Sequence, residues 1–348
     1  MELGSDFHIS FEDIEQVSDN INSYLAEFNT LYLDSGRNAI KVALQFIPIG
    51  EVLLPEYICE SVIHTFENYQ IKYYKINDDF SIDIDDLKTQ LTENTKLVFL
   101  MHYFGALQSE STLNEIKKLK QEREFFVIED TTHSIFTKAQ TIGDYCVCSL
   151  RKWLPIPDGG VLYSLNSLEC INKENISRNK NITKIYAMLL KKMYLENNMD
   201  FNEIYRSIFI ESENALNKKN EIEQISSISE FLLSCYSIKD MLNKRKANYT
   251  YLSKHFINLG FDTPALFSKN QYLFAIPIYC DKRDILRDFL SKNRIYCAIH
   301  WPVNEEETGS RSKNISNKIM SLPIDQRYNI EHMRYLLEEL KQYKEIYL

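Results

Sequence analysis

The chain has 348 residues, 44% of them hydrophobic, and a formal net charge of −9. This composition is typical of a globular protein, and the length predicts about two domains. The acidic balance argues against general nucleic-acid binding, which needs a basic face. Because no apolar run could span a membrane and the N-terminus lacks a signal-peptide pattern, we expect a cytoplasmic protein without a membrane span.

The cysteine and glycine contents exclude two further classes. Seven cysteines form no framework spacing, which favours reduced thiols in a cytoplasm. Cys146 and Cys148 share one strand face and are better explained as core residues than as metal ligands, so we expect no metal. Without a GxGxxG pattern, a nicotinamide-binding Rossmann fold loses its main signature.

The N-terminal region predicts a helix, a strand and a second helix. Residues 10–28 have amphipathic spacing with a capping-box-like start. The turn Asp34-Ser35-Gly36 then opens a helix over residues 37–46. A Ser-Gly turn at a helix start presents backbone N–H groups that suit a phosphate. An ordinary N-cap explains the same residues and is the favoured interpretation of the motif taken alone.

Strands and helices alternate through the next hundred residues. The predicted strands cover residues 52–54, 71–76, 96–101 and 125–130, and the predicted helices cover 55–68, 84–91 and 109–122. This alternation predicts a mostly parallel sheet flanked by helices. His102 follows the third strand, where a histidine satisfied within the core is favoured over a catalytic one. Asp130 ends the fourth, at the strand end where open α/β sheets bind ligands.

A lysine follows the next predicted strand, residues 145–150. Lys152 precedes a stretch with two prolines that cannot continue as helix, and Gly159-Gly160 turns the chain into another strand. A lysine at the end of a core strand costs free energy unless its charge is paired or its amine is used. A buried amine forms Schiff bases with aldehydes. A lysine that reaches solvent is the alternative.

Asp130 and Lys152 together suggest a cofactor. About twenty residues separate them, enough to leave one strand and return beside it. A carboxylate and a lysine facing one pocket suit pyridoxal phosphate, because the lysine holds the aldehyde and the carboxylate keeps the pyridine nitrogen protonated. The alternative is a buried ion pair without a cofactor, which would need excellent geometry.

The C-terminal half predicts a helical insert and a smaller α/β domain. The insert covers about residues 167–220 and carries a basic cluster around Lys184, interpreted as a solvated helix face or as a phosphate pocket. A long helix over residues 226–256 leads into strands at 273–279 and 295–299 and helices at 282–290 and 329–343. We expect a large cofactor-binding domain over residues 1–245 and a small one over 246–348.

These motifs resemble the DegT–StrS family of fold-type-I pyridoxal-phosphate aminotransferases, known for amino-sugar biosynthesis. The similarity runs from about Leu33 to the C-terminus, and its segments occur in the family's order. They are Asp34–Ile40, Glu51–Tyr57, His102–Gly105, Ile128–Asp130 with His133, Ser149 with Lys152 and Gly159-Gly160, and Arg294–Tyr296 with His300–Pro302. The resemblance implies an α/β fold with a mostly parallel seven-stranded sheet between helices and a smaller C-terminal α/β domain.

The resemblance also implies roles for single residues. Lys152 is the Schiff-base residue and moves the proton, and Asp130 pairs with the pyridine nitrogen. His133 contacts the ring hydroxyl, and His300 and Trp301 lie where family members approach substrate. The implied cofactor contacts are Gly36, Arg37, Asn38, Tyr57, Cys59, Tyr103, Asp130, His133, Ser149 and Lys152.

Cys59 is the first departure from the family's pattern. It stands where the family has an aromatic residue stacked on the pyridine ring, which leaves Tyr57, Tyr103 or His133 to cover the ring.

The other departures concern the cofactor phosphate. Arg37 stands where a small hydroxyl residue is usual, and Ser149 lies three residues before Lys152, where the family more often leaves five. Ile225 and Ser227 stand where an asparagine and an arginine normally reach across the dimer to that phosphate. We expect Arg37 to compensate through a bidentate contact.

The resemblance implies a homodimeric aminotransferase with active sites near the interface. Its small-molecule substrates are an amino donor, by family habit glutamate, and a keto-sugar, nucleotide-linked, for amino-sugar or surface-polysaccharide biosynthesis. Two alternatives stay open: a non-catalytic or regulatory pyridoxal-phosphate-binding relative, and a scaffold whose Asp130–Lys152 pair is structural.

Overall fold

The computed structural model describes residues 1–9, 14–168, 171, 176–180, 183–197, 199–219, 221–256, 259–263, 274–303 and 309–347. The chain divides into two compact units. Unit 1 contains Met1–Ser5, Ile47–Asp144 and Asp240–Leu348, and unit 2 contains Asp6–Phe46 and Tyr145–Lys239. The two units are defined by the contacts between residues of this chain. The domain boundary predicted after residue 245 stays a prediction.

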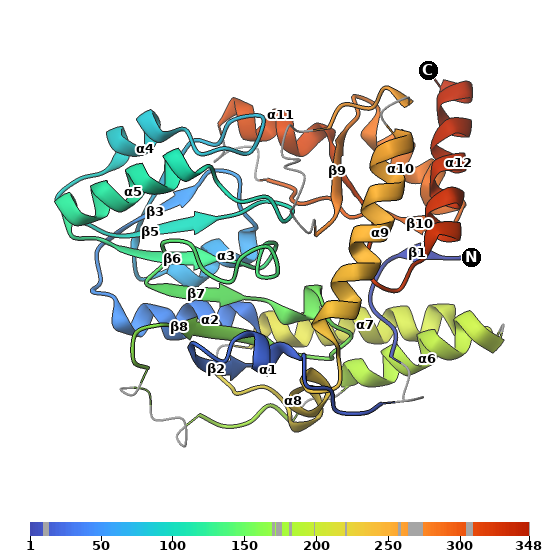
Figure 1. Cartoon of the computed structure of the whole chain (residues 1–348), viewed down its shortest axis with the longest axis horizontal. Coiled ribbons are helices and arrows are strands. Elements are labelled where there is room, and N and C mark those ends of the chain that lie inside the picture. The colour runs from blue at the N-terminus through green and yellow to red at the C-terminus, as the bar shows by residue number, and fades with distance from the viewer. Residues whose placement is uncertain are drawn as a thin grey trace. The chain divides into compact units, whose positions relative to one another are not determined.

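Unit 1 contains the parallel strands of the predicted sheet. Their order is β6 (Phe126–Asp130), β5 (Thr95–Met101), β3 (Glu51–Pro55) and β4 (Gln70–Tyr74), and each neighbouring pair is parallel (Figure 1). Every residue of β3 is buried. Because both faces of β3 are covered, its centre is a continuous apolar run, Val52–Leu54, instead of an alternating pattern.

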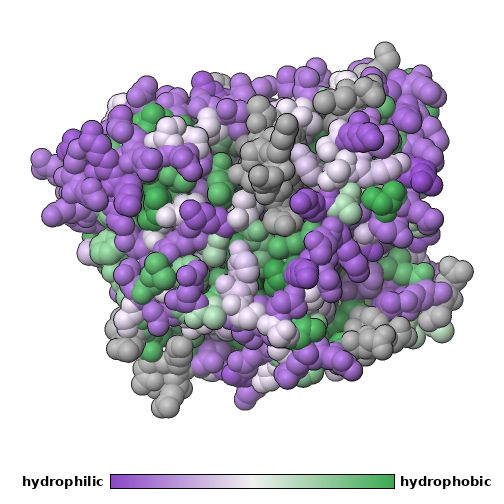
Figure 2. Space-filling model, in the orientation of Figure 1, coloured by the Kyte–Doolittle hydropathy of each residue, from purple (hydrophilic) through white to green (hydrophobic). Residues whose placement is uncertain are grey.

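Helices connect these strands. They are α3 (Glu60–Ile63) with a 3₁₀ turn at His64–Phe66, α4 (Ile84–Gln90) and α5 (Glu110–Arg123). Ser109 caps α5 by accepting a hydrogen bond from the Thr112 N–H at 3.1 Å. Figure 2 shows mostly hydrophilic residues over α4 and α5, and α5 buries only Leu113 and Ile116. The predicted α/β alternation is confirmed.

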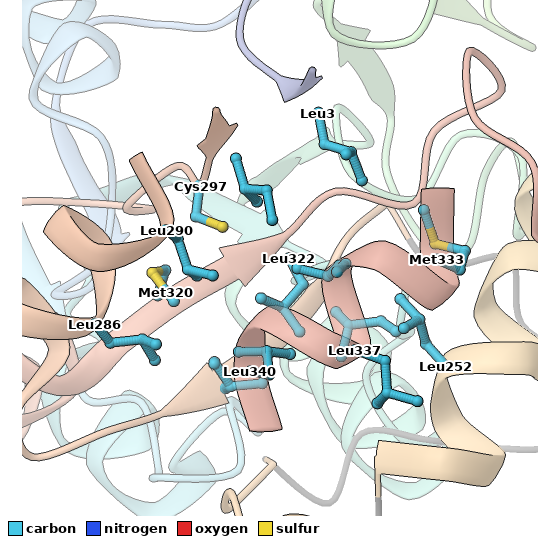
Figure 3. Packing of buried hydrophobic residues seen from close by; sticks show 14 of the residues in the cluster. Leu3, Leu252, Leu286, Leu290, Cys297, Met320, Leu322, Met333, Leu337 and Leu340 are labelled. Carbon is cyan, nitrogen blue, oxygen red and sulfur yellow. The ribbon is translucent and has the colours of Figure 1, made fainter. Parts of the chain in front are cut away.

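The C-terminal part of unit 1 has its own hydrophobic cluster (Figure 3). It lies among α9 (Ile238–Phe256), α10 (Arg283–Lys292) and α12 (Ile330–Tyr347), the antiparallel pair β9 (Ile276–Tyr279) and β11 (Ile319–Leu322), and the parallel pair β1 (Leu3–Gly4) and β10 (Ile295–Tyr296). Helix α11 (Ser310–Lys318) precedes β11. Leu290, Met320 and Leu340 are fully buried, and burying each such side chain contributes about 1.5–3 kcal/mol.

Unit 2 contains an antiparallel group of strands and the helical insert. The strand order is β2 (Asn29–Leu33), β8 (Gly160–Ser164) and β7 (Tyr145–Cys148). Helix α2 (Gly36–Ala43) follows β2 and continues as a 3₁₀ turn at Leu44–Phe46, and another 3₁₀ turn, η3 (Leu150–Lys152), follows β7. The insert forms the helices α6 (Thr183–Asn197) and α7 (Asn202–Lys218), and α8 (Ser227–Leu233) follows.

Two predicted helices differ from the structure. Among the described residues of 10–28, only α1 (Ile21–Tyr24) is helical, because Asn20 caps it through its side chain and the Val17 N–H instead donates to Ser234 O at 2.9 Å. The predicted helix over 226–256 is divided into α8 and α9. Asp19 holds this break by accepting hydrogen bonds from Ser237 Oγ at 2.7 Å and from the Ile238 N–H at 2.9 Å.

A buried hydrogen bond between a carboxylate and a histidine fixes the end of the parallel strands. Glu129 in β6 and His102 after β5 are both fully buried, with Nε2 and Oε1 3.1 Å apart. The Glu129 carboxylate also accepts the N–H groups of Thr141 at 3.0 Å and Gly143 at 2.9 Å. His102 Nδ1 accepts the Gln108 N–H at 3.0 Å, so its ring carries the proton on Nε2. His102 is therefore a core residue, as predicted.

Replacing Glu129 with Gln tests this network. Burial alone would raise the pKa of Glu129, but His102 and the backbone N–H groups hold that pKa below its ordinary value. We expect Glu129→Gln to lower the free energy of unfolding at neutral pH by about 2 kcal/mol, because a neutral amide replaces the charged acceptor of several buried N–H groups. A carboxylate with a depressed pKa stabilises the fold above its unfolded pKa, so the wild type should lose this advantage as the solution is acidified below about pH 4.5.

Urea unfolding near pH 7 and near pH 4 measures the effect. Glu115→Gln, which breaks a surface pair with Lys88, is the matched control and should leave the unfolding midpoint nearly unchanged. Equal unfolding midpoints for wild type and Glu129→Gln would contradict the argument.

Candidate active site

The turn between β2 and α2 is held by side chains of its own. Ser35 Oγ donates to Asp34 Oδ1 at 2.9 Å and accepts the Asn38 N–H at 3.3 Å. Asn38 Nδ2 donates to the same Asp34 oxygen at 2.7 Å. Burial raises the pKa of Asp34, against the opposing effects of Ser35, Asn38 and Lys219. The turn is thus a rigid start for α2, whose dipole favours an anion there.

Two glycines bring other segments against this turn. A Cβ atom at Gly160 would lie 2.2 Å from the Ser35 carbonyl carbon, and a Cβ atom at Gly36 would lie 3.2 Å from Ser149 Cβ. Ser149 precedes η3, and its carbonyl accepts the Lys152 N–H at 3.3 Å. The structure therefore brings Gly36 and Ser149 together. Ser149 stands three residues before Lys152, which is half-buried.

The helical insert is fastened to the same turn. Arg37 Nη2 donates to Leu216 O in the last turn of α7 at 3.2 Å, and Asn38 Nδ2 donates to Glu221 O at 3.1 Å. Lys219 Nζ lies 3.3 Å from Asp34 Oδ2. A cation at the carbonyl end of a helix is electrostatically favourable. A contact between Arg37 and the cofactor phosphate stays a prediction.

Residues 221–227 continue along β2. Gln224 forms an antiparallel bridge with Leu33, Ile225 is buried, and Ser227 is the first residue of α8. These are the positions where the family resemblance implied cross-dimer contacts. In this chain the backbone of these residues lies beside β2 of the same chain.

The side chains of the predicted basic cluster bind different partners. Lys184 Nζ and Arg151 Nη1 both lie 2.5 Å from one oxygen of Glu213, whereas the Lys191 amine donates to Asp6 O at 2.7 Å. Arg178 pairs with Glu230.

The ion pairs of Glu213 border a cavity within unit 2. Its volume is about 160 Å³, and Arg151, Lys184, Glu213 and Lys219 are among the residues that line it. Burial alone would raise the pKa of Glu213, but Arg151 and Lys184 lower it to about 2. The cations at this cavity thus already have carboxylate partners.

Asp130 is the last residue of β6 in unit 1. Its carboxylate is buried and accepts the Thr132 N–H at 2.8 Å. This is the carboxyl end of a parallel strand, where the sequence placed it. Lys152, the other residue predicted to be catalytic, belongs to unit 2.

Tyr57 and Tyr103 form an aromatic group with Trp301 in unit 1. The Tyr57 hydroxyl donates to His300 O and accepts the Trp301 N–H at 2.8 Å, and the Tyr103 hydroxyl donates to Tyr57 O at 2.7 Å. Burial raises the pKa of Tyr57, which keeps this hydroxyl a donor. Tyr57 therefore links the end of β3 to residues 300 and 301. Cys59 lies at the start of α3, with its sulfur 3.2 Å from Ser61 Oγ.

His133 lies in the same unit and is enclosed by aromatic rings. Its Nδ1 accepts the Phe104 N–H at 3.3 Å. The rings of Phe274 and Trp301 are stacked on it. Phe104 belongs to a motif that the sequence singled out, but no local signal marks Phe274, because the contact depends on chain folding over long separation.

The comparisons with known proteins agree with these motifs. Residues 3–153 match the model of the DegT/DnrJ/EryC1/StrS aminotransferase family. Over these residues the chain resembles the aminotransferases of that family. A pleiotropic regulatory protein of Geobacillus stearothermophilus is 18% identical to it over 359 residues, which cover 95% of this chain and 89% of that protein.

Solved structures show the same fold. PseC of Helicobacter pylori, an aminotransferase involved in the biosynthesis of pseudoaminic acid, superposes with a TM-score of 0.70 at 14% identity, covering 100% of both chains. NtdA of Bacillus subtilis, solved with bound cofactor PMP, superposes with a TM-score of 0.66 at 16% identity, covering 92% of this chain and 74% of NtdA. The predicted α/β fold of type I is confirmed, and so is the resemblance to an aminotransferase family that uses pyridoxal phosphate.

Within the residues that the structure describes, no group of histidine, cysteine, aspartate or glutamate side chains could hold a metal ion. No helix in those ranges is long and apolar enough to cross a membrane.

Replacing Gly160 with Ala tests the close contact at the turn. The added methyl group would overlap the Ser35 backbone, and such overpacking costs about 1–3 kcal/mol. We expect a lower melting temperature and weaker binding of pyridoxal phosphate, measured by thermal unfolding and by absorbance titration. At Gly50 a Cβ atom would lie 2.5 Å from Lys96 Cγ and 3.1 Å from Asn94 O, so Gly50→Ala is the overpacked control away from the turn and should leave the binding of pyridoxal phosphate unchanged. Unchanged melting and binding in Gly160→Ala would refute this account of the turn.

Proposed function

We propose that the protein transfers an amino group from glutamate to the ketone of a nucleotide-linked sugar, with pyridoxal phosphate as cofactor. The supporting observation is the Ser35–Gly36 turn packed on Ser149, three residues before Lys152, in a chain that resembles aminotransferases. The involvement of PseC in pseudoaminic acid biosynthesis favours a sugar substrate for this chain as well.

The residues present fit this cofactor. Because Gly36 and Gly160 lack a Cβ atom, the start of α2 packs closely against Ser149 and β8. The backbone N–H groups at this helix start are donors suited to a phosphate. Asp130 offers a buried carboxylate for a protonated pyridine nitrogen. Lys152 offers the amine.

Each residue then has a defined task. Pyridoxal phosphate supplies an aldehyde that takes up amino groups and a ring that accepts electrons. The Lys152 amine would take the proton from the carbon that gives up the amino group and, in the second half of the reaction, would give a proton to the carbon that receives it. Asp130 stabilises the positive charge on the ring nitrogen, and His300 and Trp301 lie on the segment proposed to approach the substrate. We also propose a homodimer with active sites near its interface.

A regulatory role is the second candidate function. Cys59, Ile225 and Ser227 depart from the family's pattern, and the relative in Geobacillus stearothermophilus is named a regulatory protein. Turnover separates the two candidates, because a regulator would bind the cofactor without moving amino groups. Incubation with glutamate and a set of keto-sugar nucleotides, followed by mass spectrometry, tests for the aminated product.

Borohydride reduction identifies the Schiff-base lysine. After reduction of the cofactor-loaded protein, the label should be fixed to the peptide that contains Lys152. Lys152→Ala should bind cofactor without fixing it and should have no turnover, because the proton carrier is lost. Lys192→Ala, which removes a surface partner of Glu196, should label like the wild type. A label on another lysine would remove Lys152 from this role.

Replacing Arg37 with Ala tests whether Arg37 holds the cofactor phosphate. A charge-assisted contact contributes about 1.5–3 kcal/mol, so we expect Arg37→Ala to weaken binding of pyridoxal phosphate about ten- to a hundredfold. Turnover at saturating cofactor should change much less. Because Arg37 also donates to Leu216 O, pyridoxal without its phosphate is the control ligand. Equal weakening of both ligands would mean that Arg37 acts only by fastening α7.

A further inference from the structure

The side chain of His133 is fixed in orientation by aromatic rings of unit 1. Only 1% of the residue is exposed. Phe274 and Trp301 are stacked on the imidazole, with centroid separations of 4.3 and 5.3 Å and interplanar angles of 9° and 14°. His300 meets it edge-on at 5.4 Å and 75°. The plane of the imidazole is therefore set by residues of the C-terminal part of the chain.

The backbone of Phe104 is used twice in this cluster. Its N–H donates to His133 Nδ1 at 3.3 Å, and its carbonyl accepts the Phe274 N–H at 2.8 Å. Phe104 has a φ angle of 54°, a left-handed conformation that is strained for a residue with a Cβ atom. Such strain persists where the surrounding structure determines it, and it often marks functional sites.

The two stacking residues are themselves anchored. Phe274 O accepts a hydrogen bond from Nη1 of the buried Arg245 at 3.0 Å. The Trp301 N–H donates to the Tyr57 hydroxyl at 2.8 Å, and Trp301 O accepts Ser316 Oγ at 2.8 Å. Contacts with α9, α11 and the end of β3 thus hold both rings in place.

These contacts determine the position of the imidazole proton. A ring nitrogen that accepts a hydrogen bond carries no proton, so the neutral ring of His133 carries its proton on Nε2. A proton on Nδ1 would face the Phe104 N–H, donor against donor. Nε2 is therefore a hydrogen-bond donor. The stacked rings set the plane of the imidazole, and a ring flipped within that plane would lose the Phe104 N–H.

We propose that Phe104, Phe274 and Trp301 are positioning residues that hold His133 as a neutral donor through Nε2. This inference rests on the proposed function and deepens it, because a donor suits an anionic oxygen on the ring of the bound cofactor and an acceptor does not. It also gives Trp301 a supporting role in place of direct contact with the substrate.

The proton position can be read in the protein without cofactor. Histidine labelled with ¹⁵N and long-range ¹H–¹⁵N correlation at about pH 7.5 distinguish protonated from unprotonated ring nitrogens. His133→Gln assigns the His133 signals. We expect Nδ1 to have the shift of an unprotonated nitrogen and Nε2 that of a protonated one. The reverse pattern, or an equal mixture, would overturn the proposal whatever the protein's activity.

Removal of a stacking ring tests the positioning roles. Trp301→Leu should shift the His133 signals toward a mixture of tautomers and weaken binding of pyridoxal phosphate about tenfold. Trp301→Phe, which keeps an aromatic ring, should restore both properties. Phe274→Leu is the second variant and should act like Trp301→Leu if the latter does not fold.

Phe66→Leu is the matched control. Phe66 is fully buried in unit 1 and contacts Phe99 and Tyr69, so its loss should lower stability without changing the His133 tautomer or cofactor binding. Wild-type tautomer and affinity in both Trp301→Leu and Phe274→Leu would overturn the positioning roles, as would the same changes in Phe66→Leu. If the wild type itself binds no pyridoxal phosphate, the proposed function is wrong, and the tautomer in the cofactor-free variants still decides whether these residues position His133.

Discussion

The candidate site depends on the close contact between the β2–α2 turn and its neighbours in unit 2. Gly160 at the start of β8 leaves no room for a Cβ atom against Ser35, and Gly36 lies against Ser149. Since β8 pairs with both β2 and β7, the strand that presses on the turn also determines where β7 ends and η3 begins. The position of the lysine in η3 is thus coupled to that of the proposed phosphate turn through one strand.

The same turn explains the arrangement of the helical insert. Asp34 is buried and has Ser35, Asn38 and Lys219 as partners, because an unpaired buried carboxylate would be costly. Lys219 follows α7 directly, and Arg37 holds the last turn of that helix. The insert therefore supplies the charges and carbonyl groups that this turn needs. Contacts within the chain thus surround a turn for which the family resemblance implied contacts from a partner subunit.

Much of this architecture could be predicted because its causes are local. The apolar runs of β3 and β5, the Ser35 and Ser109 caps and the acid that ends β6 are all readable from neighbouring residues. The lack of helix over the described residues 14–19 and the break at residues 234–237 were not readable, because Val17 and Asp19 bind Ser234 and Ser237 across more than two hundred residues of chain. Periodicity reports only which face of a helix could be buried, and tertiary hydrogen bonds decide whether that helix forms.

The candidate site shows the same limit at the level of single side chains. The sequence identified Tyr57 and His133 as residues for the cofactor ring, but their hydrogen bonds depend on residues far along the chain. The Tyr57 hydroxyl forms hydrogen bonds with the backbone of residues 300 and 301. These bonds determine where the hydroxyl points. His133 owes its orientation to Phe104 and Phe274. Because these interactions join the parallel strands of unit 1 to its C-terminal part, a substitution there acts on His133 without touching a ligand. Residue identity at a motif position therefore determines which chemistry is available, whereas the contacts around it determine which hydrogen-bonding state the side chain presents.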